Sequence, residues 1–66
     1  MLNLSEVLME MHHLQTFGEL IEVIKNRALG GEIHFRIDVK PPFSDTPEDW
    51  EDRLEAAFYE PNRVTK

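Results

Sequence analysis

The stretch that decides the fold class is residues 32–40, EIHFRIDVK. Its apolar and polar residues alternate strictly, which is the pattern of a strand with one buried and one solvated face. The apolar positions are Ile33, Phe35, Ile37 and Val39. Pro41 and Pro42 follow and end the strand, because neither residue can donate a backbone hydrogen bond to a ladder.

The sequence offers no second good strand beside this one. A lone strand leaves amides and carbonyls unpaired on both edges, an arrangement that proteins rarely leave exposed. We therefore expect its partner strand to come from another chain. The alternatives are an antiparallel copy across the two-fold axis of a homodimer and the edge of a different protein's sheet. The strand-pairing interface is then formed by Ile33, Phe35, Ile37 and Val39.

Two helices are predicted before the strand. In the first, four residues have the i, i+3, i+4, i+7 spacing of one buried stripe. They are Leu4, Val7, Leu8 and Met11. The second begins at Thr16, because residues 16–19, TFGE, have the form of a capping box. Its apolar residues lie on one face, and the simplest arrangement is a helical hairpin.

A third helix is predicted over residues 47–59. Thr46 is a good N-cap, and Pro47 occupies the favoured first helical position. Trp50, Leu54, Ala57 and Phe58 line one face, and the helix should end near Tyr59 or Glu60, ahead of Pro61. The predicted fold is an α+β domain over residues 1–60, of order α-α-β-α. Residues 61–66 form a short polar tail.

Composition limits the kind of protein this is. A chain of 66 residues buries only about 60% of the surface that its unfolded form exposes. Because the chain has no cysteine, disulfides cannot compensate for the small core. Oligomerisation is then the favoured way to gain stability. No apolar run approaches about 18 residues and no signal peptide is apparent, so we expect a soluble, cytoplasmic protein without membrane contact.

The net charge of −6 is concentrated in residues 44–60, which hold seven acids and one base. Such a face attracts basic protein surfaces and repels nucleic acid. One hypothesis is that the acids imitate the spaced phosphates of DNA and inhibit a basic nucleic-acid-binding protein, as small acidic proteins of phages and mobile elements do. In the other, Trp50, Leu54 and Phe58 anchor a partner's groove. The predicted partner-binding residues are Glu48, Asp49, Trp50, Glu51, Asp52 and Glu55.

Two alternatives stay open beside the inhibitor hypothesis. The acids can simply solvate a helix surface, in which case Trp50, Leu54 and Phe58 serve this chain's own core. The function can also be structural, an assembly role that depends on homodimerisation alone. Direct nucleic-acid binding is not expected, since the seven basic residues are scattered along the chain.

No enzymatic or metal chemistry is predicted. No serine or threonine stands in a nucleophile motif, and a domain of this size leaves little room for a pocket of about 300 Å³. Glu10 and His13 have the Glu-x-x-His spacing of di-iron bundles but face away from the apolar stripe. Neighbouring His12 and His13 point about 100° apart on a helix. We therefore expect no cofactor and no metal site.

Overall fold

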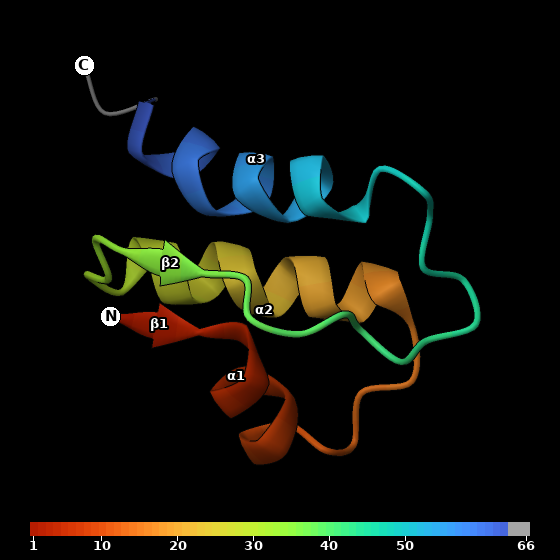
Figure 1. Ribbon diagram of the computed structural model, residues 1–66. Helices are drawn as coiled ribbons and strands as arrows, with labels where there is room; N and C mark the ends of the chain where they lie inside the picture. The colour runs from red at the N-terminus through yellow and green to blue at the C-terminus, as the bar shows by residue number, and fades with distance from the viewer. Residues whose placement is uncertain (64–66) are drawn as a thin grey trace.

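The computed structural model describes the backbone of residues 1–63 and the side chains of residues 1–60. The elements in chain order are β1 (Leu2–Asn3), α1 (Leu4–Glu10), α2 (Phe17–Leu29), β2 (Phe35–Arg36) and α3 (Trp50–Arg63). Figure 1 shows α3 lying along α2, with the two short strands beside α2 and α1 at the opposite end of the molecule from α3. The predicted α+β class is confirmed.

Helix α2 begins as its local sequence predicts. The Thr16 hydroxyl oxygen accepts a hydrogen bond from the Glu19 amide at 3.2 Å, and the Glu19 carboxylate accepts from the Thr16 amide at 3.3 Å. This reciprocal capping box satisfies two of the donors that a helix start leaves unpaired. At the other end, Gly31 has φ +114°, a conformation that glycine adopts without strain, and the chain turns there toward β2.

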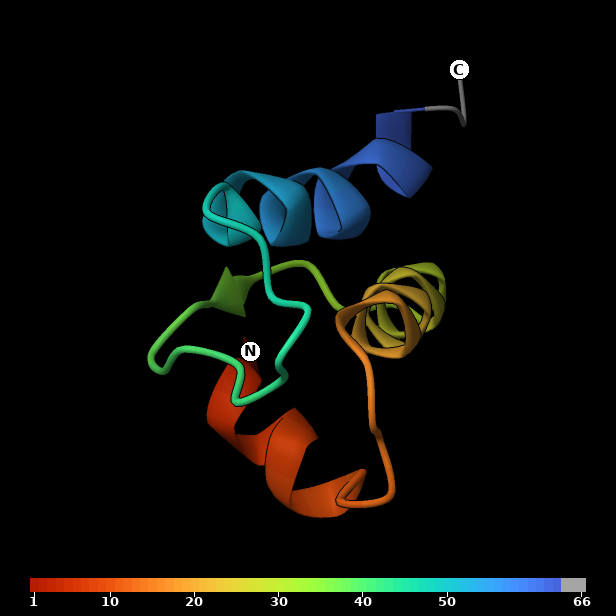
Figure 2. The same ribbon diagram turned by 90° about the vertical axis from the view of Figure 1, so that its right-hand side faces the viewer.

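The core lies mainly between α2 and α3. Figure 1 shows α3 along α2, and Figure 2, which views α2 nearly end-on, shows that α3 crosses it at an angle. Phe17, Leu20, Ile24 and Ala28 of α2 and Leu54, Ala57 and Phe58 of α3 are buried. Leu2 and the α1 residues Leu4 and Val7 complete the cluster. The predicted hairpin of the first two helices is therefore wrong, because the main partner of α2 is α3.

The strand differs from its prediction in length and in partner. It comprises Phe35–Arg36 rather than residues 32–40, and it pairs in parallel with β1 of its own chain. The Leu2 amide donates to the His34 carbonyl at 2.8 Å. Since α1 begins at Leu4, β1 can offer only two residues, and the ladder ends with it. The expectation of a partner from another chain is wrong for this edge of β2; pairing at its other edge stays a prediction.

The apolar alternation of residues 32–40 survives only at the centre. Phe35 and Ile37 are half-buried and pack against the core, and the Phe35 ring stacks on Phe58 with 5.1 Å between centroids. Ile33 and Val39 are instead 73% and 39% exposed, because they lie beyond the two-residue ladder. The predicted interface of four residues on one buried face is therefore wrong at both ends.

Helix α3 begins three residues later than predicted and ends later too. Thr46 is not its N-cap: its hydroxyl lies 3.5 Å from the Pro41 carbonyl, and its amide donates to the Phe43 carbonyl. These contacts keep Thr46 in the preceding turn. The helix continues past Pro61 to Arg63, so the predicted end at Tyr59 or Glu60 is wrong. Proline there removes only one hydrogen bond close to the helix end. Residues 64–66 of the predicted tail lie outside the described residues.

Candidate functional site

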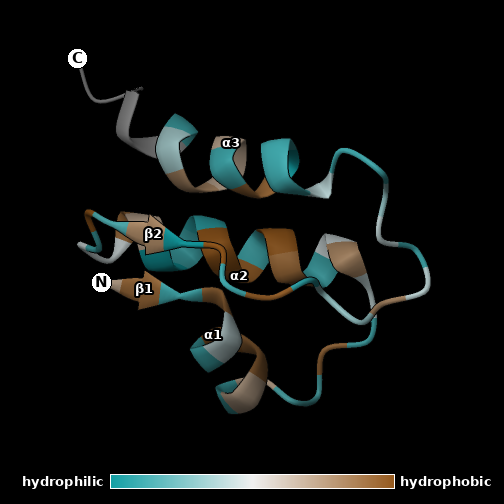
Figure 3. Ribbon diagram, viewed as in Figure 1, coloured by the Kyte–Doolittle hydropathy of each residue, from teal (hydrophilic) through white to brown (hydrophobic). Residues whose placement is uncertain are grey.

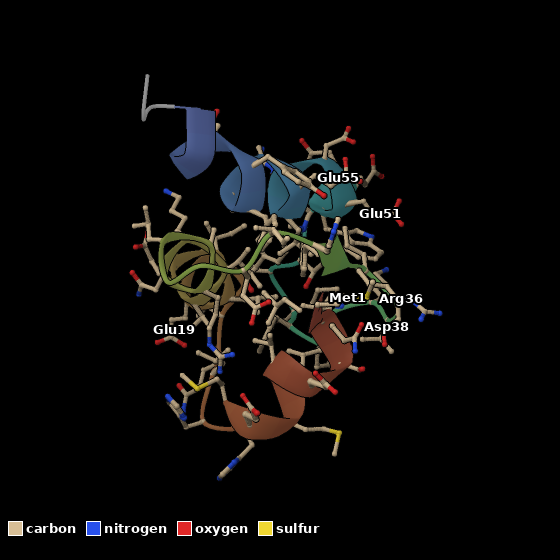
Figure 4. All side chains as sticks on the ribbon, turned by 90° about the vertical axis from the view of Figure 1, so that its left-hand side faces the viewer. Met1, Glu19, Arg36, Asp38, Glu51 and Glu55 are labelled. Carbon is tan, nitrogen blue, oxygen red and sulfur yellow. The ribbon has the colours of Figure 1, made fainter. Side chains whose placement is uncertain are left out.

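The outward side of α3 and the turn before it carry a group of exposed carboxylates, which we call the acidic face. Its members are Glu48, Glu51, Asp52 and Glu55. The adjoining side of the helix is apolar, and there Leu54 and Phe58 are fully buried. In Figure 3 the first turns of α3 have mostly the colour of hydrophilic residues, and in Figure 4 Glu51 and Glu55 extend outward on the side where Arg36 also lies.

Two acids of the acidic stretch, residues 44–60, have partners within the chain. The Asp45 carboxylate accepts a hydrogen bond from the Phe17 amide at 2.9 Å and so caps the first turn of α2. The Asp49 carboxylate accepts from Arg53 Nε at 2.8 Å, and this hydrogen bond lowers the pKa of Asp49. Asp45 therefore has a structural role, and the charge of Asp49 is partly compensated.

The predicted anchor row serves this chain's own core. Leu54 and Phe58 are fully buried, and Trp50 is half-buried and packed against the core cluster. A side chain that fills its own core cannot enter a partner's groove without unfolding part of the domain. Near the start of α3, the acids Glu51, Asp52 and Glu55 are exposed and Trp50 is half-exposed.

Asp38 is a structural residue that no pattern in the sequence singles out. Its carboxylate accepts two hydrogen bonds from Ser5, at 3.0 Å from the amide and 2.7 Å from the hydroxyl. Both hydrogen bonds lower the pKa of Asp38, and the bond from the Ser5 hydroxyl has a larger effect than the bond from the Ser5 amide. The contact spans 33 positions in sequence, so no local motif announces it. Asp38 thus caps α1, whereas the N-cap residue Asn3 makes no side-chain capping bond.

Glu10 is the last residue of α1 and His13 lies in the turn after it, so the Glu-x-x-His spacing does not fall on one helix. The Glu10 carboxylate accepts from Arg27 Nη2 at 2.6 Å, which links α1 to α2. The His12 and His13 rings lie edge to face with 6.4 Å between centroids. Among the residues described, no three His, Cys, Asp or Glu side chains are placed to hold a metal ion.

A groove of about 380 Å³ runs between α2 and α3. Its α2 wall is formed by Phe17, Gly18, Ile21, Glu22 and Lys25, and its α3 wall by Arg53, Ala56, Ala57 and Glu60. The expectation that the chain has little room for a pocket of about 300 Å³ is therefore wrong in volume. The groove is open to solvent. We call it the α2–α3 groove.

The chain matches no protein-family model, and neither the curated proteins nor the solved structures include a significant match to it. No helix within residues 1–63 is long and apolar enough to cross a membrane.

Proposed function

We propose that this protein is a small non-catalytic module that binds a basic surface of another protein through the acidic face. The observation that carries the proposal is that α3 uses one side for the core and exposes its acids on another side. Its apolar side is used in the domain's own core, while Glu51, Asp52 and Glu55 remain exposed, with no ion pair to any other described side chain. The helix thus presents carboxylates that no described basic side chain neutralises.

The chemistry of the face defines the partner. Carboxylates held on one rigid helix produce a negative potential that steers a positively charged surface and accepts charge-assisted hydrogen bonds from arginine and lysine. A groove that binds nucleic acid has such a surface, because it must neutralise phosphates. Occupying that groove would make the protein an inhibitor or modulator of a nucleic-acid-binding protein.

The experiment begins with affinity capture from the source cell, followed by titration of the purified captured protein. The test variant combines Glu48→Gln, Glu51→Gln, Asp52→Asn and Glu55→Gln. Neutral residues are preferable to lysines because Glu51 and Asp52 lie in the first turn of α3, where lysines would oppose the helix dipole. The matched control makes the same charge change elsewhere, with Glu6, Glu10, Glu22 and Glu32 each changed to Gln.

Binding of the test variant should weaken by at least about tenfold, while the control retains most of its affinity. Binding by the native chain should also weaken between low salt and 0.15 M, where the Debye length is about 8 Å. Equal losses in both variants would show that only net charge matters. Undiminished binding by the test variant would exclude the acidic face as the binding surface.

A further inference from the structure

The α2–α3 groove differs in charge from the rest of the molecule. Its rim carries two bases, Lys25 and Arg53, and two acids, Glu22 and Glu60, in a chain whose net charge is −6. A balanced rim does not suit the strongly basic partner expected at the acidic face. It suits a partner whose own charges are also mixed.

The order of residues along the α3 wall indicates which partner would fit the groove. Arg53 and Glu60 are seven residues apart, so they lie within about 20° of each other around the helix. Ala56 and Ala57 stand between them, and Ala56 is exposed. A two-fold axis through the midpoint of this stripe places Arg53 of one copy opposite Glu60 of an antiparallel second copy, and the reverse pair follows by symmetry.

We propose that the α2–α3 groove is occupied by a second copy of this chain, which packs α3 against α3 in antiparallel orientation. Ala56 is small and exposed and lets the two backbones approach closely, while Ala57 is buried in the core of each copy. Each interface then contains two Arg53–Glu60 pairs. Arg53 can make this contact while keeping Asp49, because only its Nε is used there and the guanidinium has further N–H donors.

The dimer is compatible with the acidic face and goes beyond the function proposed for it. Glu51 and Glu55 lie about 140–180° around the helix from Arg53 and Glu60. Packing at the groove therefore leaves the acids of both copies exposed on opposite sides of the dimer. It also buries apolar surface in a chain of 66 residues, whose size alone limits its core.

Reciprocal charge reversal tests the arrangement. The variants are Arg53→Glu, Glu60→Arg and the double variant, each checked for folding by circular dichroism. Sedimentation velocity from micromolar to a few hundred micromolar then measures the dimer dissociation constant. Each single variant places like charges opposite each other twice and should weaken dimerisation by at least about tenfold.

Restoring dimerisation by re-creating the opposite-charge pairs distinguishes the Arg53–Glu60 contact from a general effect of net charge. The double variant re-creates two opposite-charge pairs and should dimerise again. An equimolar mixture of the two single variants should form a heterodimer. In it the glutamate introduced by Arg53→Glu in one chain meets the arginine introduced by Glu60→Arg in the other, while the native residues form the second pair. A structural role of Arg53 or Glu60 within one chain predicts no rescue on mixing.

Three results would overturn the proposal: a monomeric native chain throughout this concentration range, a dimer insensitive to both single variants, or weakened dimers that mixing fails to restore. If a single variant fails to fold, Ala56→Gln replaces it, since Ala56 is exposed and the change adds bulk to the interface without charge. Ala56→Gln should dissociate the dimer, and an unaffected dimer would reject the interface. The neutralised acidic-face variant should still dimerise, so this proposal and the proposed function fail independently.

Discussion

The α2–α3 pair and the α1 corner are held in place by different forces. Between α2 and α3, fully buried Leu20, Ile24, Leu54 and Phe58 contribute an apolar interface. Helix α1 has seven residues and buries only Leu4 and Val7, and it is also tied to the rest of the domain by polar contacts. The stabilisation from apolar burial does not depend on pH, whereas hydrogen bonds to a carboxylate weaken when the carboxylate is protonated. The two regions should therefore fail under different perturbations.

The largest effect is expected from breaking the apolar interface. Leu54→Ala should reduce the free energy of unfolding by about 2–5 kcal/mol, because it leaves a cavity between the two helices. For a domain whose total stability is about 5 kcal/mol, that approaches complete unfolding. Urea denaturation followed by circular dichroism measures the loss. The matched control is Leu29→Ala: Leu29 is 66% exposed, so its loss should be within about 0.5 kcal/mol. Equal losses would contradict the assignment of the core.

A smaller and local effect is expected at the α1 corner. Asp38→Ala removes the acceptor of both Ser5 hydrogen bonds and leaves the start of α1 uncapped. Amide exchange in residues 4–10 should become several-fold faster, while α2 keeps its protection. Ser5→Ala removes only the hydroxyl bond and should give an intermediate change. Uniform acceleration across α1 and α2 would mean that the corner does not open separately.

The contrast between the regions also explains what the sequence predicts well. The start of α2 depends on Thr16 and Glu19, three positions apart, and its prediction is confirmed. The strand length depends on β1, which is too short to give a periodic signal. The start of α3 is displaced because the segment before it is used elsewhere, with Asp45 capping α2. Features that depend on residues close in sequence can thus be predicted, whereas helix and strand boundaries that depend on residues far apart in sequence cannot.

The same reasoning holds for the candidate site. Glu51, Leu54, Glu55 and Phe58 share one i, i+3, i+4, i+7 spacing, so their polarity rather than their periodicity predicts that the two acids are exposed and the two apolar residues buried, as the structure shows. The i, i+4 spacing of Asp49 and Arg53 is a local signal for their ion pair, whereas no such signal indicates the groove. The groove depends on how α3 packs against α2, which no spacing within one helix specifies.

A pH series sharpens the comparison further. The pKa of Asp38 lies below its ordinary value of 3.8 because Ser5 hydrogen-bonds the charged form. A folded-state pKa below the unfolded one means that this stabilisation is complete above about pH 4 and is lost as the pH falls through the lowered pKa. The gap in melting temperature between the native chain and Asp38→Asn should therefore narrow below about pH 4. Glu55→Gln, which removes an exposed carboxylate from α3, is the control for loss of charge. A gap that stays constant down to about pH 2.5 would contradict the role of Asp38.

The smallest effect is expected at the ion pair that links α1 to α2. Glu10 and Arg27 side chains are 60% and 38% exposed, so water and salt screen their attraction despite the 2.6 Å distance. Glu10→Gln should cost at most about 1 kcal/mol. Urea denaturation at low salt and at 1 M salt provides the test, because screening at 1 M reduces the Debye length to about 3 Å and should remove the difference between Glu10→Gln and the native chain. A loss that persists at high salt would mean that Glu10 acts through packing or a neutral hydrogen bond, and that α1 depends less on charge than its contacts indicate.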